Sequence, residues 1–339
     1  MSYLKHSVIV SLIVFSVLAL GCACTKKSSL PRNPLLEMAP DSSRGFTDKV
    51  ALNVLDDLVL LRPDGVVTID ALGSARAAWA PDGNSLLVIT KQPGSNPYSD
   101  LKVIRESDFS VVSIQSNVFN CGGVDWSPDG HTIVFSGGFE PSFEIGLYTM
   151  ALEEAVPTLI PEGDCGDSFC CSPSWSLDGS RIAFFSANGV EVIELGVPNQ
   201  HQIVYPLVRD DTRGCTSWEN VSWFPDSERL LVSYGLEITL VDLRDNSVHT
   251  LLDVNQEGIV GGVKAMILPD GQHIVYEADY HYSVTEQNVE LGWDRFHMEL
   301  MLVDLSDLQW RDITPPLGNA KPDEPPGINI SLLDWWQAP

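Results

Sequence analysis

The chain has 339 residues and a formal net charge of −26, from 20 lysines and arginines against 46 aspartates and glutamates. So negative a charge repels phosphate backbones, and no stripe of Lys or Arg is present, which argues against a nucleic-acid binder. Hydrophobic residues make up 44% of the chain and aromatic residues 9%, which is enough for a large core and inconsistent with a mainly disordered protein.

The first twenty residues indicate export. A short segment with Lys5 and His6 precedes a mostly apolar run from Val8 to Leu20. As a helix this run would span only about 20 Å, too short for a hydrocarbon core of about 30 Å, so a secretion signal is favoured over a membrane span. Gly21 and Cys22 directly after the run resemble the lipobox of bacterial lipoproteins, in which the cysteine is lipidated and becomes the mature N-terminus.

The alternative is an ordinary cleaved signal with Cys22 as an incidental thiol. Residues 23–45 are rich in Pro, Ser and Lys without periodicity, which is typical of a flexible tether. We therefore expect a signal peptide over 1–21, a tether over 22–45 and a folded domain over 46–339. The expected location is a bacterial cell envelope, with a lipid anchor in the membrane and the domain facing the periplasm or the cell exterior. In such an oxidising compartment, cysteines favour disulfides.

A hairpin phrase recurs five times. The phrases are AAWAPDGNSLLVIT, VDWSPDGHTIVFSG, PSWSLDGSRIAFFS, VSWFPDSERLLVSY and AMILPDGQHIVYEA. Their aspartates, 44 to 49 residues apart, are Asp82, Asp129, Asp178, Asp226 and Asp270. Each phrase reads as a strand, a turn capped by its own aspartate, and a second strand. The recurring aromatic position is held by Trp79, Trp126, Trp175, Trp223 and Trp335. These side chains predict packing between neighbouring units rather than ligand stacking.

Two further extended runs follow each hairpin, which predicts four strands per unit. No amphipathic helix of useful length interrupts the pattern. Residues 328–336 supply one strand and residues 50–70 supply three, so the two ends would complete one unit and hide its edges. The sequence predicts an all-β fold: a six-bladed β-propeller of four-stranded antiparallel blades, closed by N- and C-terminal strands in one blade.

The repeated WSPDG-type hairpin resembles the six-bladed propellers of the TolB family, from about residue 46 to the end. The resemblance implies the propeller fold, which serves envelope scaffolds, peptidase accessory domains and some lyases. In the family's namesake an α/β domain precedes the propeller, and the tether here leaves no room for one. The same role in transport is therefore not expected.

Connections between the predicted strands fall into two classes. The turns inside each repeat are tight, whereas the connections on the opposite side are long. The long connections cover residues 117–123, 161–172, 209–220, 253–262 and 315–327, together with an insertion over 279–298. Long loops in a compact domain are commonly functional, so the side that carries them is predicted to bind the partner.

Aromatic residues mark this long-loop side. The candidate partner-binding residues are Tyr280, His281, Tyr282, Trp293 and Phe296 in the insertion, with Trp218 and Phe169 in neighbouring connections. Amphipathic aromatics anchor protein interfaces and sugar rings, although packing of the same rings onto the propeller rim is the plainer alternative.

Five cysteines fall in the connections of three successive units. They are Cys121, Cys165, Cys170, Cys171 and Cys215. We expect disulfides among them; zinc is the weaker alternative, because the spacing is not that of a zinc site and no histidine lies close in sequence. Their odd number leaves one thiol free, or paired with Cys24 or with another chain.

No GxSxG, GxGxxG, Walker or HExxH motif is present, which weakens an enzymatic function without removing it. No cofactor and no metal site is predicted. The preferred function is a non-enzymatic envelope lipoprotein that binds an envelope protein or a peptidoglycan-associated partner through its long-loop side. One alternative is a propeller hydrolase or lyase acting on polysaccharide or peptide, with Asp279 and His281 near the channel mouth; another is a sugar-binding module without catalysis.

Overall fold

Runs of β-branched and aromatic residues alternate with short polar turns, and in the computed structural model these runs form strands. The structure describes residues 48–54, 57–69, 72, 74–92, 97–141, 145–164, 171–198, 200–207, 219–253, 259–286, 289–313 and 330–336, and over 278–299 it describes the course of the backbone only. These residues contain no helix. A search of them for a helix long and apolar enough to cross a membrane accordingly finds none.

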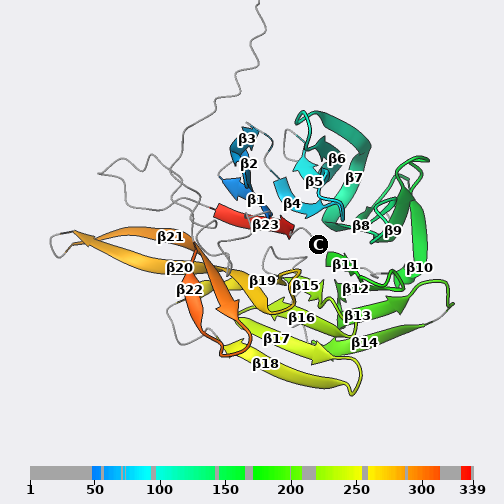
Figure 1. Ribbon diagram of the computed structural model, residues 1–339. Coiled ribbons are helices and arrows are strands. Elements are labelled where there is room, and N and C mark those ends of the chain that lie inside the picture. Colours follow the sequence, from blue (N-terminus) through cyan, green and yellow to red (C-terminus); the bar gives the residue numbers. More distant parts are fainter. Residues whose placement is uncertain are drawn as a thin grey trace, which may run out of the picture.

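The described strands form antiparallel sheets (Figure 1). One sheet joins the two ends of the described chain, in the order β23 (Ile330–Trp336), β1 (Lys49–Val54), β2 (Asp57–Arg62) and β3 (Gly65–Ile69). The next sheet has seven strands: β4 (Ser74–Trp79), β5 (Ser85–Lys91), β6 (Tyr98–Arg105), β7 (Val111–Trp126), β8 (Thr132–Gly138), β9 (Gly146–Ala151) and β10 (Thr158–Asp164).

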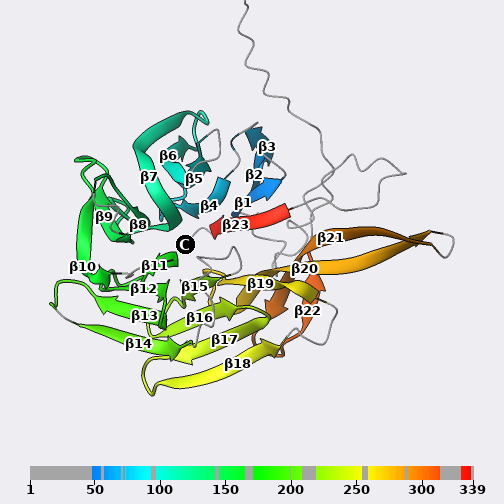
Figure 2. The same ribbon diagram turned by 180° about the vertical axis from the view of Figure 1, so that it is seen from behind.

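Three further sheets have four strands each. They contain β11 (Cys171–Trp175), β12 (Arg181–Ser186), β13 (Gly189–Glu194) and β14 (His201–Pro206); then β15 (Asn220–Trp223), β16 (Arg229–Tyr234), β17 (Glu237–Asp242) and β18 (Ser247–Asp253); and finally β19 (Ile259–Ile267), β20 (His273–Glu286), β21 (Val289–Asp304) and β22 (Trp310–Asp312). Figures 1 and 2 show the sheets arranged side by side around a common centre, with β4, β11, β15, β19 and β23 innermost.

Strand β7 belongs to two units at once. Its first half pairs with β6 and its second half with β8, so that Val112 lies opposite Val103 and Trp126 opposite Ile133. The expectation of a loop over 117–123 is therefore wrong, because the chain stays extended from one unit into the next. The seven-stranded sheet is two four-stranded units that share this strand.

The turns inside the repeats are closed by their own aspartates. Oδ1 of each aspartate accepts a hydrogen bond of 2.8 to 3.0 Å from the backbone N–H two residues further on. This holds at Asp82, Asp129, Asp178, Asp226 and Asp270, so the expected Asx capping is present in all five turns. The glycine after the aspartate has a positive φ, and in the fourth turn Ser227 takes that conformation instead, at φ 57°.

The hydrophobic core lies between neighbouring units. One cluster joins Leu60 of β2 to Trp79 of β4, another joins Phe185 of β12 to Trp223 of β15, and a third joins β1 to β20 and β21. The indole N–H of Trp126 donates to the carbonyl of Ala78 in the preceding unit at 2.9 Å, and that of Trp223 makes the equivalent bond at 3.0 Å. These tryptophans therefore fill the spaces between units.

Side chains also join the innermost strands. Asp334 Oδ2 accepts a hydrogen bond from the backbone N–H of Trp79 at 2.5 Å, and Asp125 Oδ2 accepts one from Trp175 at 2.7 Å. In a third pair of units, Ser222 Oγ accepts the equivalent hydrogen bond from the backbone N–H of Ile267 at 3.2 Å. All three acceptors stand directly before the recurring aromatic position, so one sequence position links each of these units to its neighbour.

Candidate functional site

The two sides of the sheets differ in how their strands are connected. On one side lie the Asp-capped turns of the repeats, which all have the same short form. The connections between β5 and β6, between β8 and β9, and between β20 and β21 lie at the opposite ends of those strands. We call this the long-loop side, as defined from the sequence; the β20–β21 connection and the pocket beside β7 lie on it.

The connection between β20 and β21 is a two-stranded β-ribbon rather than a loop. Pairing runs without a third strand from His281 opposite Phe296 out to Glu286 opposite Val289. Strand β19 pairs with β20 only as far as Tyr280, and β22 pairs only with the C-terminal end of β21. Figures 1 and 2 show the ribbon extending beyond the neighbouring sheets. The insertion over 279–298 is thus built as strands, which corrects the expectation of an irregular loop.

The ribbon places several candidate partner-binding residues opposite one another or close by. In the backbone register, Tyr280 lies opposite His297, His281 opposite Phe296, and Tyr282 opposite Arg295. Trp293 lies on the same β21 segment. Their part in binding stays a prediction. The same holds for Trp218 and Phe169, which lie outside the described residues, and for Asp279 and His281 as catalytic groups.

The predicted disulfides stay predictions too. Cys121 and Cys171 lie on β7 and β11, the inner strands of neighbouring units, whereas Cys165, Cys170, Cys215 and the predicted lipidation site Cys22 lie outside the described residues. The two strands approach closely, because a Cβ added at Gly123 would lie 2.8 Å from the backbone nitrogen of Ser172. Within the described part of the chain, no three His, Cys, Asp or Glu side chains gather as a group that could hold a metal ion.

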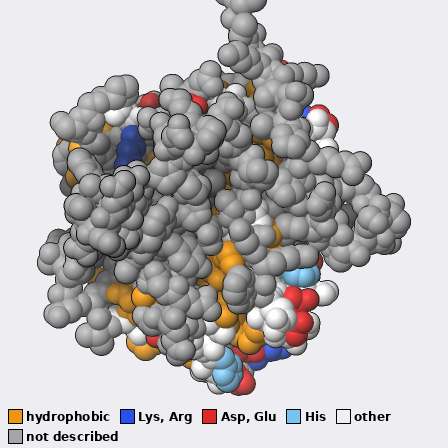
Figure 3. Space-filling view, turned by 90° about the vertical axis from the view of Figure 1, so that its left-hand side faces the viewer, with side chains coloured by type: hydrophobic (Ala, Val, Ile, Leu, Met, Phe, Trp, Pro, Cys, Tyr) orange, Lys and Arg blue, Asp and Glu red, His pale blue; other side chains and the backbone are white. Residues whose placement is uncertain are grey.

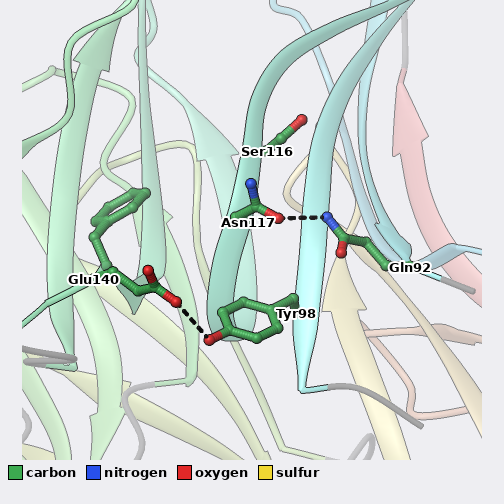
Figure 4. Close-up of a pocket in the computed structure, with 6 residues that line it drawn as sticks. Gln92, Tyr98, Ser116, Asn117 and Glu140 are labelled. Carbon is green, nitrogen blue, oxygen red and sulfur yellow. Dashed lines mark hydrogen bonds between the residues drawn. The ribbon is translucent and has the colours of Figure 1, made fainter. Parts of the chain in front are cut away.

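A pocket of about 470 Å³ opens on the long-loop side between the two units that share β7. It is lined by Gln92, Tyr98, Ser116, Asn117, Phe139 and Glu140. Figure 4 shows Gln92 and Tyr98 on one unit, Glu140 on the next, and Ser116 and Asn117 on β7 between them. The Gln92 amide donates to Asn117 Oδ1 at 3.0 Å, and the Tyr98 hydroxyl donates to Glu140 Oε1 at 3.3 Å.

A β-bulge in β7 creates the middle wall of this pocket. Val118 lies opposite Ser99, and Gln115 lies opposite Leu101. Two residues of β7, Ser116 and Asn117, therefore face one residue of β6, Asp100. Asn117 has a φ of 58°, in the left-handed region that asparagine tolerates better than most residues. Bulges redirect side chains and are common beside binding sites. This one turns two polar residues out of the ladder and into the pocket.

Asp100 holds the bulge from the opposite strand. Its Oδ1 accepts hydrogen bonds from Gln92 Nε2 at 2.8 Å and from the backbone N–H of Asn117 at 3.4 Å. Burial first, and then the Glu140 carboxylate, raise the pKa of Tyr98 above its ordinary value, so the phenol stays protonated and remains a donor. The polar lining is therefore fixed by contacts within the protein.

Sequence reasoning missed Gln92, Tyr98 and Glu140 as site residues. Gln92 and Tyr98 flank the connection between β5 and β6, whereas Glu140 follows β8, and none of them belongs to a local motif. Asn117 was placed in a connection of the long-loop side, and an Asn next to a Ser is the one local signal compatible with a positive φ.

A second group of polar residues lies among the innermost strands. Lys264 and Glu277 are buried, with 3% and 1% of their surface exposed. Burial and then the charge of Arg76 lower the pKa of Lys264 to about 8, against the opposing effect of Glu277. Burial raises the pKa of Asp125 to about 7, and the charge of Asp334 acts in the same direction. The centre of the molecule thus holds both charge signs under strong desolvation.

Comparison with known proteins identifies the fold. No family model matches the chain. No curated protein matches it either. Among solved structures, TolB from Acinetobacter baumannii is similar with a TM-score of 0.58 and 14% identity, over 80% of this chain and 64% of that one. The chain therefore spans less than two thirds of that TolB.

Two other solved structures show the same likeness. A TolB-type protein from Agrobacterium tumefaciens matches with a TM-score of 0.53 and 13% identity, over 80% of this chain and 90% of that chain. A chain of a nidogen/laminin complex matches with a TM-score of 0.55 and 9% identity, over 78% and 92%. At these identities the likeness concerns the fold alone: the chain has an all-β fold of antiparallel sheets similar to that of TolB-type proteins.

Proposed function

We propose that this protein is a propeller scaffold that binds a protein partner through its long-loop side, with the β20–β21 ribbon as the main contact. The observation that carries the proposal is the ribbon itself. Beyond Tyr280 its described strands pair only with each other. A two-stranded hairpin is at best marginally stable alone in water, so a partner surface that covers the ribbon would stabilise it.

The outer edges of the ribbon suggest how a partner engages it. An unpaired strand edge presents a row of backbone N–H and C=O groups that an incoming strand can pair with. The aromatic positions along the same segment would supply the apolar contacts that give such an interface its affinity. Main-chain pairing and aromatic anchors together favour a protein over a small molecule at this place.

The scaffold is a closed six-bladed ring in this proposal. The described strands fall into six four-stranded units, counting β7 in two of them. Hydrophobic clusters join each unit to the next, and the cluster of β1 with β20 and β21 joins the last to the first. A ring of this kind holds the ribbon at a fixed angle, which reduces the entropy lost on binding.

Export and lipidation would place the scaffold in a bacterial envelope. The apolar run before Cys22 and the polar tether after it support this part of the proposal. The net charge of −26 and the exposed acidic side chains visible in Figure 3 favour a partner with a basic surface, since complementary charge speeds encounter. The similarity to TolB-type folds is compatible with an envelope role.

Crosslinked affinity capture from native envelopes tests the proposal. The full protein is compared with a variant in which 279–298 is replaced by a short Gly-Ser turn. In a matched control the same Gly-Ser replaces Asp245 and Asn246, the turn between β17 and β18 on the opposite side. A partner retained by the full protein and the control, but lost from the shortened variant, supports the ribbon. Equal capture by all three proteins contradicts it.

A further inference from the structure

The pocket between the two units that share β7 has unused hydrogen-bonding capacity of both kinds. Gln92 Nε2 donates to Asn117 and to Asp100, which fixes the amide and leaves Gln92 Oε1 to accept. Asn117 Oδ1 is occupied by that bond, which leaves Asn117 Nδ2 to donate. Among the described residues, neither Gln92 Oε1 nor Asn117 Nδ2 has a hydrogen-bond partner. Glu140 adds acceptor capacity beside the Tyr98 hydroxyl.

Two aromatic rings line the same pocket and are held in place by their neighbours. Phe139 makes edge-to-face contacts with Phe135 and Tyr148 at centroid distances of 6.1 and 5.0 Å. Tyr98 packs in the same way against Phe119 at 5.7 Å. Rings fixed by such contacts offer rigid apolar surfaces to a ligand, and binding to them costs little side-chain entropy.

The charge of the lining narrows the class of ligand. Among the described residues that line the pocket, Glu140 is the one charged side chain and none is Lys, Arg or His. A phosphate or carboxylate would meet this negative charge without a compensating cation. The volume of about 470 Å³ lies within the range of small-molecule sites, roughly 300 to 1,000 Å³.

We propose that this pocket binds a neutral sugar. A sugar ring carries hydroxyl groups that both donate and accept, which suits the Asn117 donor together with the Gln92 and Glu140 acceptors. Its C–H faces suit the rings of Tyr98 and Phe139. The bulge that turns Ser116 and Asn117 into the pocket is the local distortion expected where a strand is adapted to a ligand. This site is independent of the partner-binding ribbon.

The chain offers a matched control for the central residue. Asn246 has a φ of 57°, almost equal to that of Asn117, and its Oδ1 accepts a hydrogen bond from Gln202 at 3.3 Å on an exposed surface. The Asn246–Gln202 pair therefore reproduces the backbone conformation and the amide pairing of Asn117–Gln92 away from the pocket. Substitution by glycine at either asparagine removes the side chain and leaves the positive φ unstrained.

Saturation-transfer NMR and calorimetry on the full chain test the proposal. The probes are glucose, galactose, mannose and N-acetylglucosamine, with short N-acetylglucosamine oligomers to distinguish a glycan chain from a free sugar. We expect at least one probe to bind, and Asn117→Gly or Gln92→Ala to weaken it about tenfold. Asn246→Gly and Gln202→Ala should leave the affinity unchanged.

Three results would overturn the inference. The first is no binding by any probe up to about 10 mM, a weak limit for a specific site. The second is binding that the pocket variants do not affect. The third is competition by tetramethylammonium with no sugar bound, which would assign the aromatic and acidic lining to a cation. Because the shortened-ribbon variant keeps the pocket, a failure here is distinguishable from a failure of partner capture.

Discussion

The Asp125→Asn variant should change how stability depends on pH. Asp125 Oδ1 accepts a hydrogen bond from the N–H of Trp126 at 2.8 Å, and Oδ2 accepts one from Trp175 in the next unit. Burial raises the pKa of this carboxyl to about 7 in spite of those bonds. The folded protein therefore holds a proton on Asp125 at pH values where the unfolded chain has lost it.

The sign and size of the effect follow from this difference. Between about pH 4 and pH 7 the folded state binds more protons than the unfolded state, so the free energy of unfolding falls as pH rises. A shift of about three units corresponds to about 4 kcal/mol, of which about 3 kcal/mol falls between pH 5 and pH 8. We expect about 2 kcal/mol, because Asp125 keeps some solvent exposure.

Urea unfolding followed by tryptophan fluorescence, at a series of pH values from about 5 to about 8, measures this quantity. At low pH the asparagine introduced by the substitution should cost about 1 to 2 kcal/mol, since its NH₂ group faces one of the two backbone N–H donors. That deficit should shrink by about 2 kcal/mol as pH rises, because only the wild type loses stability.

Asp129→Asn is the matched control. Asp129 lies in the turn of the same unit, where the hydrogen bond from Ser127 lowers the pKa of its carboxyl. A group with a lowered pKa loses its stabilising effect as pH falls, so this variant should show the opposite trend at acidic pH. Parallel pH curves for wild type and Asp125→Asn would refute the assignment of a raised pKa to Asp125.

The same unfolding assay, extended to about pH 10 for the last of them, checks three further expectations. Trp126→Phe should lower the free energy of unfolding by about 1 to 2 kcal/mol, because the indole hydrogen bond to the preceding unit is lost. Trp175→Phe should lower it by less, because that indole N–H donates within its own turn; equal losses would contradict this. Gly189→Ala should lower the free energy of unfolding by about 3 kcal/mol or more, because the added Cβ would lie 2.1 Å from a carbonyl oxygen of β14. Gly65→Ala, whose Cβ would meet no atom, should lower it only by the strain of the positive φ, about 1 kcal/mol. With a pKa of about 8 in the folded state, Lys264 should make stability rise with pH between about 8 and 10, a rise that Lys264→Met should lack.

The sequence was most informative where structure is local and repeated. A turn such as that at Asp129 is specified by adjacent residues, and its Asx hydrogen bond could be predicted from them. The recurring tryptophans could be assigned to the spaces between units because a wide apolar side chain at one position of every repeat must be buried in an equivalent place. Strand β23 could be paired with β1 by the same reasoning, since the last unit would otherwise lack a strand.

The expectations that were wrong have two different causes. Residues 279–298 pair with each other as a hairpin, and the sequence Gln287-Asn288 between the two halves is not one of the common hairpin-turn pairs. Residues 117–123 include two Asn and two Gly, residue types typical of turns, and only pairing with the strands on either side keeps this segment extended. The pocket was out of reach for the second of these reasons. Gln92, Asn117 and Glu140 come from three separate segments, and the bulge that positions Asn117 depends on the register of β7 against β6.

Sharing β7 has a consequence for local opening. The two units on either side of it have no loop between them at which one could detach alone, because unfolding either one strips hydrogen bonds from the same strand. Their amide hydrogens should therefore exchange with solvent as one cooperative block, whereas units with separate strands, such as β11–β14 and β15–β18, can open singly. The molecule should then be stiffest along the part of its circumference that carries the pocket.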